Sequence, residues 1–394
     1  MQGQSSEALV VGAGIGGLAA ALSLRRIGLR VRVLERTQDA RELGFALLLA
    51  PNAMSALRAL GLAEEVRAAG VVLGSGEMRR PNGDVLRRFD TTRVSAALGE
   101  DSVCVLRPAL HGVLLRALGA EALELGVHVT GVRQREADVF VECENAPDLQ
   151  GRLVVGADGV GSAIRQSLHP EELPPKRSGL IGIRGVARNA VQHLGGASAA
   201  QYFGRRLEAG MSQATATDVY WFVSVSAAVR PPPKVDVRSL LDAYLGAFHA
   251  PFRALVAATS DADLRVDDLL DRPPLRRWGQ GAITLLGDAA HPMLPHAGQG
   301  AAQALEDAVA LGRALQTQGF VEPALRRYEQ VRIPRTRIIS QLARRNARMG
   351  SLGNPLSCWL RDLAVQRIPE RVLLRSLIDL GRPPEDLAPS SREH

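Results

Sequence analysis

Apolar and polar positions alternate in distinct ways along the first part of the chain, and each pattern predicts a type of element. Residues 8–11 are continuously apolar and predict a buried strand, and residues 18–24 predict a helix that ends near Gly28. Residues 31–35 predict the next strand. A strand, a helix and a strand within about thirty residues are typical of a right-handed βαβ unit in a parallel sheet.

Later segments add a second type of sheet and a helical C-terminal part. Residues 127–132 and 139–144 alternate as antiparallel strands do, and short β-rich pieces follow between residues 179 and 226. Further helices are predicted over residues 51–60, 106–125 and 237–248, and further strands over residues 153–157, 180–186, 219–225 and 282–286. The chain from Gly300 onward is predicted to be helical, with a stop or a kink near Pro334.

The composition is that of an ordinary globular protein. The chain has 394 residues, of which 46% are hydrophobic and 23% charged, so it can bury a large core. No run reaches the roughly 18 apolar residues that span a bilayer, and the N-terminus has no signal-peptide pattern. The chain has only three cysteines, Cys104, Cys143 and Cys358, and they are widely spaced. This pattern indicates reduced thiols. We therefore expect a cytoplasmic protein.

The net charge of +7 comes almost entirely from scattered arginines. Nucleic-acid binding favours a concentrated basic stripe with interleaved aromatic residues, whereas aromatic residues make up only 4% of this chain. We therefore expect no nucleic-acid partner. A basic field that attracts anionic nucleotides is one interpretation of the charge, and arginine usage set by genome composition is a simpler one.

A glycine-rich turn joins the first predicted strand to the first helix. Gly12, Gly14 and Gly17 form the pattern G-x-G-x-x-G, which allows a tight turn, close approach of a pyrophosphate and close helix packing. The helix N-terminus presents free N–H groups to negative charge. Glu35 ends the second strand, where a carboxylate can accept hydrogen bonds from a ribose diol. The motif predicts a dinucleotide site without distinguishing NAD from FAD, and Arg36 fits either a 2′-phosphate or solvent exposure.

Two further glycine-containing motifs follow at the ends of predicted strands. Residues 156–165 read GADGVGSAIR, and residues 287–308 form a longer motif that begins GDAAHP. Asp288 follows directly on a strand, where its carboxylate can hold the ribityl hydroxyl groups of a flavin. Residues 298–300 open the next helix and supply a second helix N-terminus for a phosphate or an electron-rich ring edge.

With these three motifs in this order, the chain resembles the class A flavoprotein monooxygenases with the p-hydroxybenzoate hydroxylase fold. It is most similar to the group that contains salicylate hydroxylase, 3-hydroxybenzoate 6-hydroxylase and the flavin urate oxidases. The resemblance covers most of the chain and implies FAD as the resident cofactor. The residues that it assigns to FAD binding are Gly12, Ala13, Gly14, Gly16, Gly17, Glu35, Arg36, Arg41, Arg107, Asp158, Asp288, Gly298, Gly300 and Ala301.

The resemblance also implies an α/β fold, in which a Rossmann-type FAD-binding domain is interleaved with a β-sheet substrate domain and followed by C-terminal helices. The FAD-binding domain is expected to comprise residues 1–75, 100–178 and 270–320. The substrate-binding domain is expected to comprise residues 76–99 and 179–269, and the C-terminal helical region residues 321–394.

The activity that the resemblance implies is that of a monooxygenase. NADH or NADPH, bound transiently, would reduce FAD, and reduced flavin would react with O₂ to give a C4a-hydroperoxide. That species would hydroxylate an aromatic or similarly electron-rich, apolar small molecule, while the protein orients the reactants and excludes water. Epoxidation of an alkene or quinone-like ring is an alternative, and so is a non-catalytic protein that binds FAD and a ligand. The halogenase signature W-x-W-x-I-P does not occur in the sequence.

Fewer residues are assigned to catalysis and to the substrate. Pro295 and His296 are expected beside the flavin ring, and Arg184 aligns loosely with a substrate-facing arginine of the family. The simpler interpretations are that His296 is an exposed loop histidine and that Arg184 is a surface arginine. An apolar substrate pocket is expected from Leu47, Leu48, Tyr202, Phe203 and Val223. Leu48 stands where family members often have glutamine, so we expect a dry pocket beside the flavin.

The C-terminal part predicts amphipathic helices between residues 352 and 380. Their apolar side carries Leu356, Trp359, Leu360 and Leu363, and we expect it to pack on the main body. Contact with a membrane surface, from which a lipophilic substrate is reached, is an alternative. The protein is expected to be a monomer or a homodimer.

Overall fold

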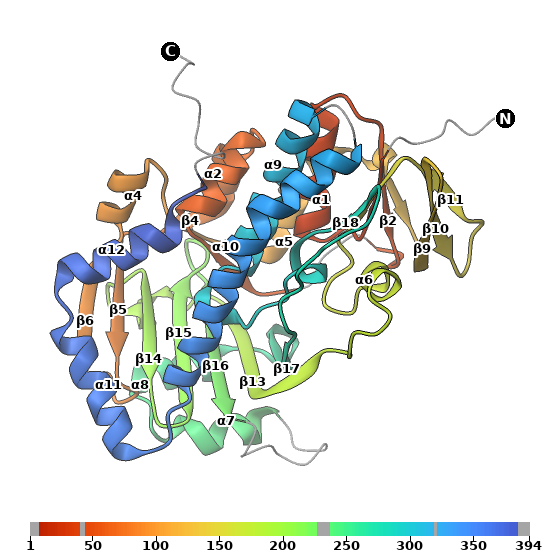
Figure 1. The fold of residues 1–394 in the computed structure, drawn as a ribbon. Helices are drawn as coiled ribbons and strands as arrows, with labels where there is room; N and C mark the ends of the chain where they lie inside the picture. The colour runs from red at the N-terminus through yellow and green to blue at the C-terminus, as the bar shows by residue number, and fades with distance from the viewer. Residues whose placement is uncertain (1–7, 40–43, 227–236, 319–320, 385–394) are drawn as a thin grey trace.

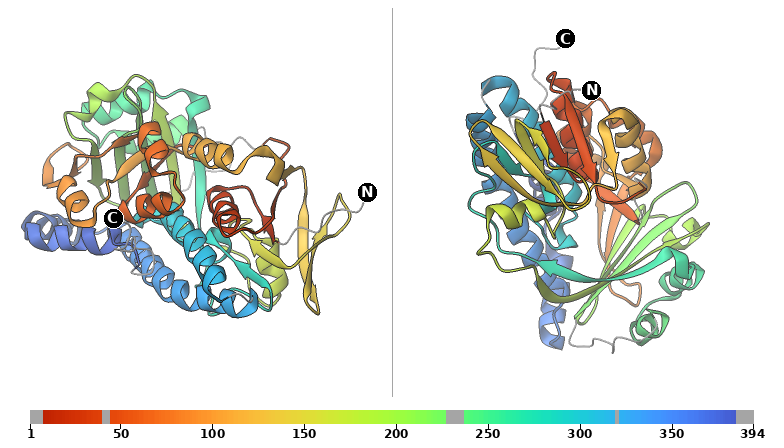
Figure 2. Two further views of the ribbon diagram at one scale, coloured as in Figure 1. Left: turned by 90° about the horizontal axis from the view of Figure 1, so that it is seen from above. Right: turned by 90° about the vertical axis from the view of Figure 1, so that its right-hand side faces the viewer.

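The computed structural model describes residues 8–39, 44–226, 237–318 and 321–384. Arg41, which the resemblance assigns to FAD binding, lies outside the described residues. Two large β-sheets occupy different halves of the molecule, and the long helix α10 (Val321–Gly350) runs along both halves (Figures 1 and 2).

The first half is built on a parallel sheet with the strand order β18-β12-β1-β2-β8. Its strands are β1 Ala8–Val11, β2 Val31–Glu35, β8 Leu123–Leu125, β12 Leu153–Gly156 and β18 Ile283–Leu285. The three strands β1, β12 and β18 are buried along their whole length, which is why their sequences are continuously apolar. The predicted βαβ unit of β1, α1 (Ile15–Arg26) and β2 is confirmed.

Helices α5 (Arg107–Leu118) and α9 (Gly300–Gln318) pack against α1 on this sheet. The helix predicted over residues 106–125 is wrong at its C-terminal end. Helix α5 stops because Gly119 has a φ of +82°, and residues 123–125 then form the edge strand β8. The pattern of residues 123–125 fits a strand as well as a helix, and pairing with β2 decides between them.

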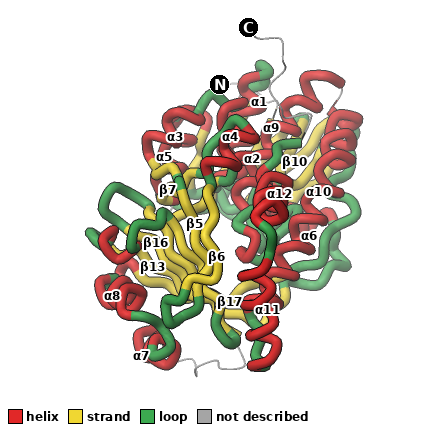
Figure 3. The backbone as a smooth tube through the Cα atoms, turned by 90° about the vertical axis from the view of Figure 1, so that its left-hand side faces the viewer, coloured by secondary structure: helices red, strands yellow, loops and turns green. Residues whose placement is uncertain are grey.

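The second half is a seven-stranded sheet with the order β17-β13-β16-β15-β14-β5-β6. Its strands are β5 Ser75–Arg79, β6 Val85–Asp90, β13 Lys176–Ala187, β14 Ala199–Phe203, β15 Leu207–Gln213, β16 Val219–Ser226 and β17 Leu264–Asp271. Helices α7 (Val237–Leu245) and α8 (Ala250–Ala258) cover one face and share a hydrophobic core with it. Helices α10 and α11 (Pro355–Arg367) lie on the other side (Figure 3).

The remaining elements connect or flank these sheets. The short sheet β3-β7-β4 contributes Ala46 and Cys104 to a small apolar cluster with Ala214 and Tyr220, which joins the two halves.

The bounds of the connecting and flanking elements are β3 Ala46–Leu49, α2 Pro51–Ala59, α3 Ala63–Ala69, β4 Gly70–Val72, α4 Thr92–Leu98, β7 Val103–Leu106, β9 Val129–Arg135, β10 Asp138–Cys143, β11 Leu149–Gly151, α6 Ala163–Leu168 and α12 Glu370–Gly381. The antiparallel strands predicted over residues 127–132 and 139–144 are confirmed as β9 and β10.

A stop or a kink was predicted near Pro334, and helix α10 continues through this residue, so the stop is wrong. A proline inside a helix costs about 3 kcal/mol, because it removes one hydrogen bond and crowds the preceding turn. Arg332 and Arg335, on either side of the proline, bind buried carboxylates of α9. These ion pairs hold the two helices together across the position where the helix would otherwise end.

The apolar side of α11 is exposed, contrary to the predicted packing. Leu356, Trp359 and Leu360 have exposed fractions of 63%, 55% and 51%. The opposite side of the helix is anchored instead, because the buried Arg361 donates hydrogen bonds to the carbonyl oxygens of Phe203 and Gly204. No helix in the part of the chain that the structure describes is long and apolar enough to cross a membrane.

Candidate functional site

The three glycine-containing motifs meet at one edge of the parallel sheet. The first follows β1, the second follows β12 and the third follows β18, and these three strands are neighbours in the sheet. Ala157 donates a backbone hydrogen bond to Val11, and Leu286 donates one to Gly156. The carboxyl ends of parallel strands share one edge, and ligands of open α/β sheets bind there.

The first motif forms a tight turn that leaves open space on one side. Gly12 has a φ of +102°, and a Cβ there would lie 2.5 Å from the carbonyl oxygen of Ala157. A Cβ at Gly17 would lie 1.9 Å from the carbonyl oxygen of Gly12, so both positions require glycine. A Cβ at Gly14 would meet nothing within 4 Å. The turn thus brings the N-terminus of α1 to a space that a phosphate group can enter.

Glu35 lies beside this turn at the end of β2. Its carboxylate accepts hydrogen bonds from the backbone N–H groups of Ala13 (2.9 Å) and Thr37 (3.0 Å). The Thr37 hydroxyl donates a third hydrogen bond to this carboxylate (3.1 Å). A carboxylate has about four acceptor positions, so one more hydrogen bond, from a ribose hydroxyl group, can be accommodated. Arg36 is exposed to solvent.

Asp288 follows β18 and remains exposed at this edge of the sheet. Protein atoms crowded around the side chain raise the pKa of its carboxyl group, and the positive charges of His291 and Arg107 oppose that rise. The charge of Arg107, at the start of α5, thus acts on the Asp288 carboxyl group. An exposed carboxylate that is nevertheless surrounded by protein is suited to bind the hydroxyl groups of a cofactor.

The second motif has a structural function that the sequence did not reveal. Asp158 accepts hydrogen bonds from Ala163 (2.7 Å) and Ile164 (3.3 Å) and so caps α6, while its Oδ1 has no hydrogen-bond partner among the described residues. Arg165 is fully buried and donates to the carbonyl oxygens of Ala289 (3.0 Å) and Ala290 (3.1 Å). Arg165 thereby ties the second motif to the segment that carries Asp288.

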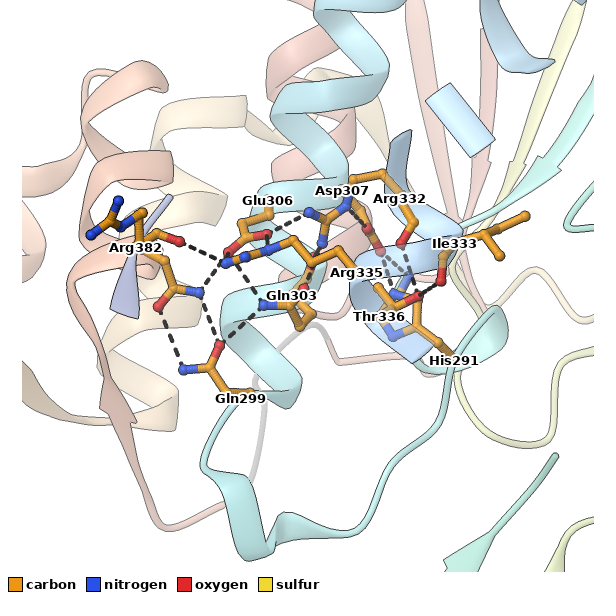
Figure 4. Close-up of polar contacts among 12 residues, drawn as sticks. His291, Gln299, Gln303, Glu306, Asp307, Arg332, Ile333, Arg335, Thr336 and Arg382 are labelled. Atoms are coloured by element: carbon orange, nitrogen blue, oxygen red, sulfur yellow. Dashed lines mark hydrogen bonds and ion pairs between the residues drawn. The ribbon is translucent and has the colours of Figure 1, made fainter. Parts of the chain in front are cut away.

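A buried polar network fixes the third motif from the opposite side (Figure 4). Asp307 accepts hydrogen bonds from the backbone N–H of Gly287 (3.0 Å) and from Arg332 (2.6 Å), and its Oδ2 lies 2.5 Å from Nε2 of His291. Arg332 also pairs with Glu306, and all three charged side chains are fully buried. Burial opposes ionisation, but His291 and Arg332 outweigh it and lower the pKa of Asp307 to about 2.

The end of the third motif is open to solvent beside α9. Pro295 and Gly298 are exposed, and α9 begins at Gly300. A Cβ at Gly298 or Gly300 would meet nothing within 4 Å, and Ala301 is half-buried in the first turn of α9. The N-terminus of a 19-residue helix thus faces open space, where its N–H groups can stabilise negative charge.

The prediction that five residues line one apolar pocket is wrong in part. Successive side chains of a strand point to opposite faces of the sheet, so these residues do not all lie on the same face. Tyr202 and Val223 belong to the core beneath α7 and α8, and the Tyr202 hydroxyl lies 2.9 Å from Nε2 of His249. Leu47 packs on the core of the parallel-sheet half. Leu48 is 41% exposed and lies on the opposite face of β3. Phe203 lies on the face of β14 opposite Tyr202, under the guanidinium of Arg361.

The sheet face that meets the parallel-sheet half is amphipathic. Tyr220, Phe222 and Ser224 alternate on β16 with the core residues, and Arg184 of β13 lies directly opposite Phe222. The ring centroids of Phe45 and Tyr220 are 6.4 Å apart, and those of Tyr220 and Phe222 6.3 Å. Burial raises the pKa of the Tyr220 hydroxyl to about 12, and the positive charge of Arg184 opposes this.

His296 reaches this same sheet face from the third motif. Its Nε2 lies 3.1 Å from Oγ of Ser224, and Glu208 of β15 is paired with Ser224 in the register of the sheet. The sequence patterns did not assign Tyr220, Phe222, Ser224 or Glu208 to the site. A strand over residues 219–226 places the first three on one face, but the sequence does not tell which face meets the parallel-sheet half, and it carries no signal for Glu208.

Comparisons with known proteins agree with this geometry. A family model described as "FAD binding domain" matches residues 5–342. The chain is 34% identical over 354 residues to aurachin C monooxygenase/isomerase of Stigmatella aurantiaca. The alignment covers 90% of this chain and 92% of that protein. It is 33% identical over 344 residues to 3-hydroxybenzoate 6-hydroxylase of Klebsiella oxytoca, covering 84% of this chain and 85% of that protein.

A solved structure extends the similarity over nearly the whole fold. The crystal structure of Klebsiella pneumoniae HpxO complexed with FAD and uric acid is 25% identical in sequence, with a TM-score of 0.90. The match covers 97% of each chain. From the family match, the relatives and the fold, the chain belongs to the FAD binding domain family and is an FAD-dependent monooxygenase with the fold of p-hydroxybenzoate hydroxylase.

Proposed function

We propose that this enzyme inserts one oxygen atom of O₂ into an aromatic or similarly electron-rich ring that carries an acidic oxygen, with NADH or NADPH as reductant. The observation that carries this proposal is the sheet face of Arg184, Tyr220 and Phe222, which meets the half that carries the three motifs. Aromatic side chains pack against a planar ring, and a guanidinium binds an anionic oxygen. Two similar proteins, a 3-hydroxybenzoate 6-hydroxylase and a protein complexed with uric acid, agree with this substrate class by their names.

The residues that we assign to FAD follow from the open space around the motifs. The turn Gly12–Gly17 and the carboxylate of Glu35 would hold the adenosine diphosphate part, and Asp288 with Arg107 would hold the ribityl chain. The N-terminus of α9, with Gly298, Gly300 and Ala301, would face the ring. FAD supplies the redox chemistry, while these residues bind it, orient it and stabilise negative charge beside it. The unpartnered Oδ1 of Asp158 is a further acceptor for the cofactor.

The division into domains is likewise proposed. The FAD-binding part would comprise residues 1–75, 100–178 and 270–320, because these segments supply the parallel sheet and its motifs. The substrate-binding part would comprise residues 76–99 and 179–269, which supply nearly all of the seven-stranded sheet. The substrate would then lie between the two halves, where cofactor and ring can meet.

The direct test is a turnover assay under isotopically labelled O₂. FAD-loaded protein would be mixed with NADH or NADPH and a panel of hydroxybenzoates, hydroxypyridines and hydroxyquinolines. We expect reductant consumption that depends on one class of ring, and a product that contains one labelled oxygen atom. Reductant consumption that yields only H₂O₂ with every ring would contradict the proposal. An epoxide has the same mass as the hydroxylated ring, so NMR of the product distinguishes the two, and an epoxide would leave the oxygen transfer intact and change the substrate class.

Replacing Arg184 by methionine is expected to weaken binding of substrates with an acidic oxygen. A hydrogen bond to a charged group contributes about 1.5–3 kcal/mol, so KM should rise about 10- to 100-fold. Reduction of FAD by NAD(P)H without substrate should not change, since Arg184 is assigned to the substrate alone. Arg177→Met is the matched control, because Arg177 lies on the same strand and its side chain is 60% exposed. Equal KM values in the two variants would contradict the assignment.

A further inference from the structure

A buried glutamate lies on the substrate-facing side of the seven-stranded sheet. Glu208 of β15 is 3% exposed, and its Oε1 accepts a hydrogen bond from Nε2 of Gln201 (2.7 Å). Its Oε2 has no hydrogen-bond partner in the described part of the chain. Buried polar atoms are nearly always hydrogen-bonded, so an unpartnered carboxylate oxygen in this position calls for a functional explanation.

His296 lies next to this free oxygen. Nε2 of His296 is 4.0 Å from Oε2 of Glu208 and 3.1 Å from Oγ of Ser224, and the His296 side chain is 3% exposed. Its Nδ1 also lacks a partner among the described residues, so the contacts at Nε2 decide the tautomer of the ring. Asn346 of α10 donates a hydrogen bond to the carbonyl oxygen of His296 (3.0 Å) and holds the segment in place.

Burial favours the uncharged form of both groups. Burial raises the pKa of Glu208 to about 7 and lowers the pKa of His296 to about 4. The charge that faces Glu208 is Arg361 of α11, which opposes the rise but is itself paired with Asp362 at 2.9 Å. Gln201 of β14 and Ser224 of β16 contribute only uncharged groups. Helix α10 meets the carboxyl group through Gly350, where a Cβ would lie 2.1 Å from Oε2.

We propose that Ser224, His296 and Glu208 form a proton relay that removes the proton from the acidic O–H group of the bound substrate. This inference rests on the proposed function. Ser224 is the outer end of the relay, because it is on the same face of β16 as Phe222, which lies opposite Arg184. Glu208 is the inner end, and a rotation of its carboxyl group closes the 4.0 Å gap to His296.

The relay moves one proton and no electrons to the protein. The substrate O–H bond breaks, its electron pair stays on the oxygen, and the proton passes to Oγ of Ser224. The proton originally on Ser224 passes to Nε2 of His296. The ring then turns this N–H from Ser224 toward Glu208, whose carboxylate takes the proton, so His296 returns to its neutral form. The electron-rich ring that results is the form of the substrate that attacks an electrophilic oxygen. When the ring regains aromaticity, the proton that leaves its carbon atom replaces the one that was removed. Glu208 then releases its proton to water, which restores the carboxylate before the next turnover.

The protonation state of Glu208 can be measured without turnover. Infrared difference spectra of the FAD-loaded enzyme should contain the C=O band of a protonated carboxyl group, and this band should titrate with a pKa near the value of about 7 that burial gives Glu208. The band should be missing in Glu208→Gln and unchanged in Glu65→Gln, since Glu65 is exposed on α3. Identical spectra of the wild type and Glu208→Gln above about pH 6 would overturn the proposal, because Glu208 would then ionise as an ordinary glutamate does.

Turnover gives the second readout. In the wild type, the fraction of reductant that yields oxygenated product should rise as the pH passes through about 7, where Glu208 becomes a carboxylate and can accept the proton. In Glu208→Gln, Ser224→Ala and His296→Gln this rise should disappear, and product formation should fall about 100-fold, the lower end of general acid–base catalysis. The rate of FAD reduction should not change, which separates the relay from a loss of fold or of cofactor.

The outcomes also separate this inference from the proposed function. If the wild type inserts no oxygen into any ring, both the proposed function and the relay are contradicted. If oxygen is inserted with the same pH profile in the wild type and in all three variants, the relay alone is overturned. Loss of the pH dependence in Ser224→Ala, which removes one small buried hydroxyl group, supports the relay even if Glu208→Gln folds poorly.

Discussion

Asp288→Ala protein is expected to be purified largely without FAD. Asp288 is an exposed carboxylate at the carboxyl end of β18, crowded by protein and close to Arg107. Hydrogen bonds to a charged group contribute about 1.5–3 kcal/mol each, so loss of two to the ribityl hydroxyl groups would weaken FAD binding by roughly 100-fold or more. The ratio of flavin absorbance to protein absorbance after gel filtration measures the occupancy.

Two further variants make this result specific. Asp288→Asn keeps the shape of the side chain but removes its charge, and we expect intermediate occupancy. Asp379→Ala removes an exposed carboxylate of α12 and should leave the occupancy at the wild-type value. Full FAD occupancy in Asp288→Ala would mean that this carboxylate does not hold the cofactor, whatever the rest of the motif does.

Arg332→Met is expected to destabilise the whole protein. Arg332 is the buried cation shared by Glu306 and Asp307, and all three side chains are fully buried. Removing one partner of a buried ion pair leaves a carboxylate without compensation and costs about 3–5 kcal/mol. Arg335 still binds Glu306, so the loss falls mainly on Asp307 and the backbone of Gly287 that it holds.

Denaturant unfolding followed by tryptophan fluorescence measures this loss, because Trp278 is buried beside His291 and Tyr328. Arg375→Met is the control, since the side chain of Arg375 is 84% exposed and lies 3.9 Å from the Asp379 carboxylate. An exposed pair contributes less than about 1 kcal/mol. Equal unfolding midpoints for the two variants would show that the network in Figure 4 does not support the fold.

The half built on the parallel sheet could be predicted well, because the sequence patterns that define it are local. A continuously apolar strand, a glycine turn and an acid at the next strand end are adjacent in the chain, and the structure forms each of them from adjacent residues. The family relationship and the FAD cofactor followed from the same motifs. The supporting contacts were not predictable in this way. Arg165 bonds to carbonyl groups 124 and 125 residues away, and nothing near it in the sequence marks those partners.

In the half with the seven-stranded sheet, the sequence alone does not predict which side chains share a face. Residues 219–226 are rich in valine and aromatic residues, which predicts a strand, but the sequence does not tell which element packs on each of its two faces. Tertiary packing placed the α7 and α8 helices on the face of Trp221 and Val223, and left Tyr220, Phe222 and Ser224 for the cofactor-binding half. The apolar stripe of α11 is a similar case, because buried hydrogen bonds of Arg361 oriented the helix and exposed Trp359.

By itself, the sequence determined that this protein holds FAD and transfers oxygen, because those properties depend on residue types at short, fixed spacings. Only the tertiary structure decided which side chains share a sheet face with Arg184 and which buried polar groups lie together. Glu208, Ser224 and His296 come from three separate elements, and the register of β15 against β16 places the first two side by side. Such contacts depend on packing energies summed over the whole chain, so they cannot be predicted from any single segment.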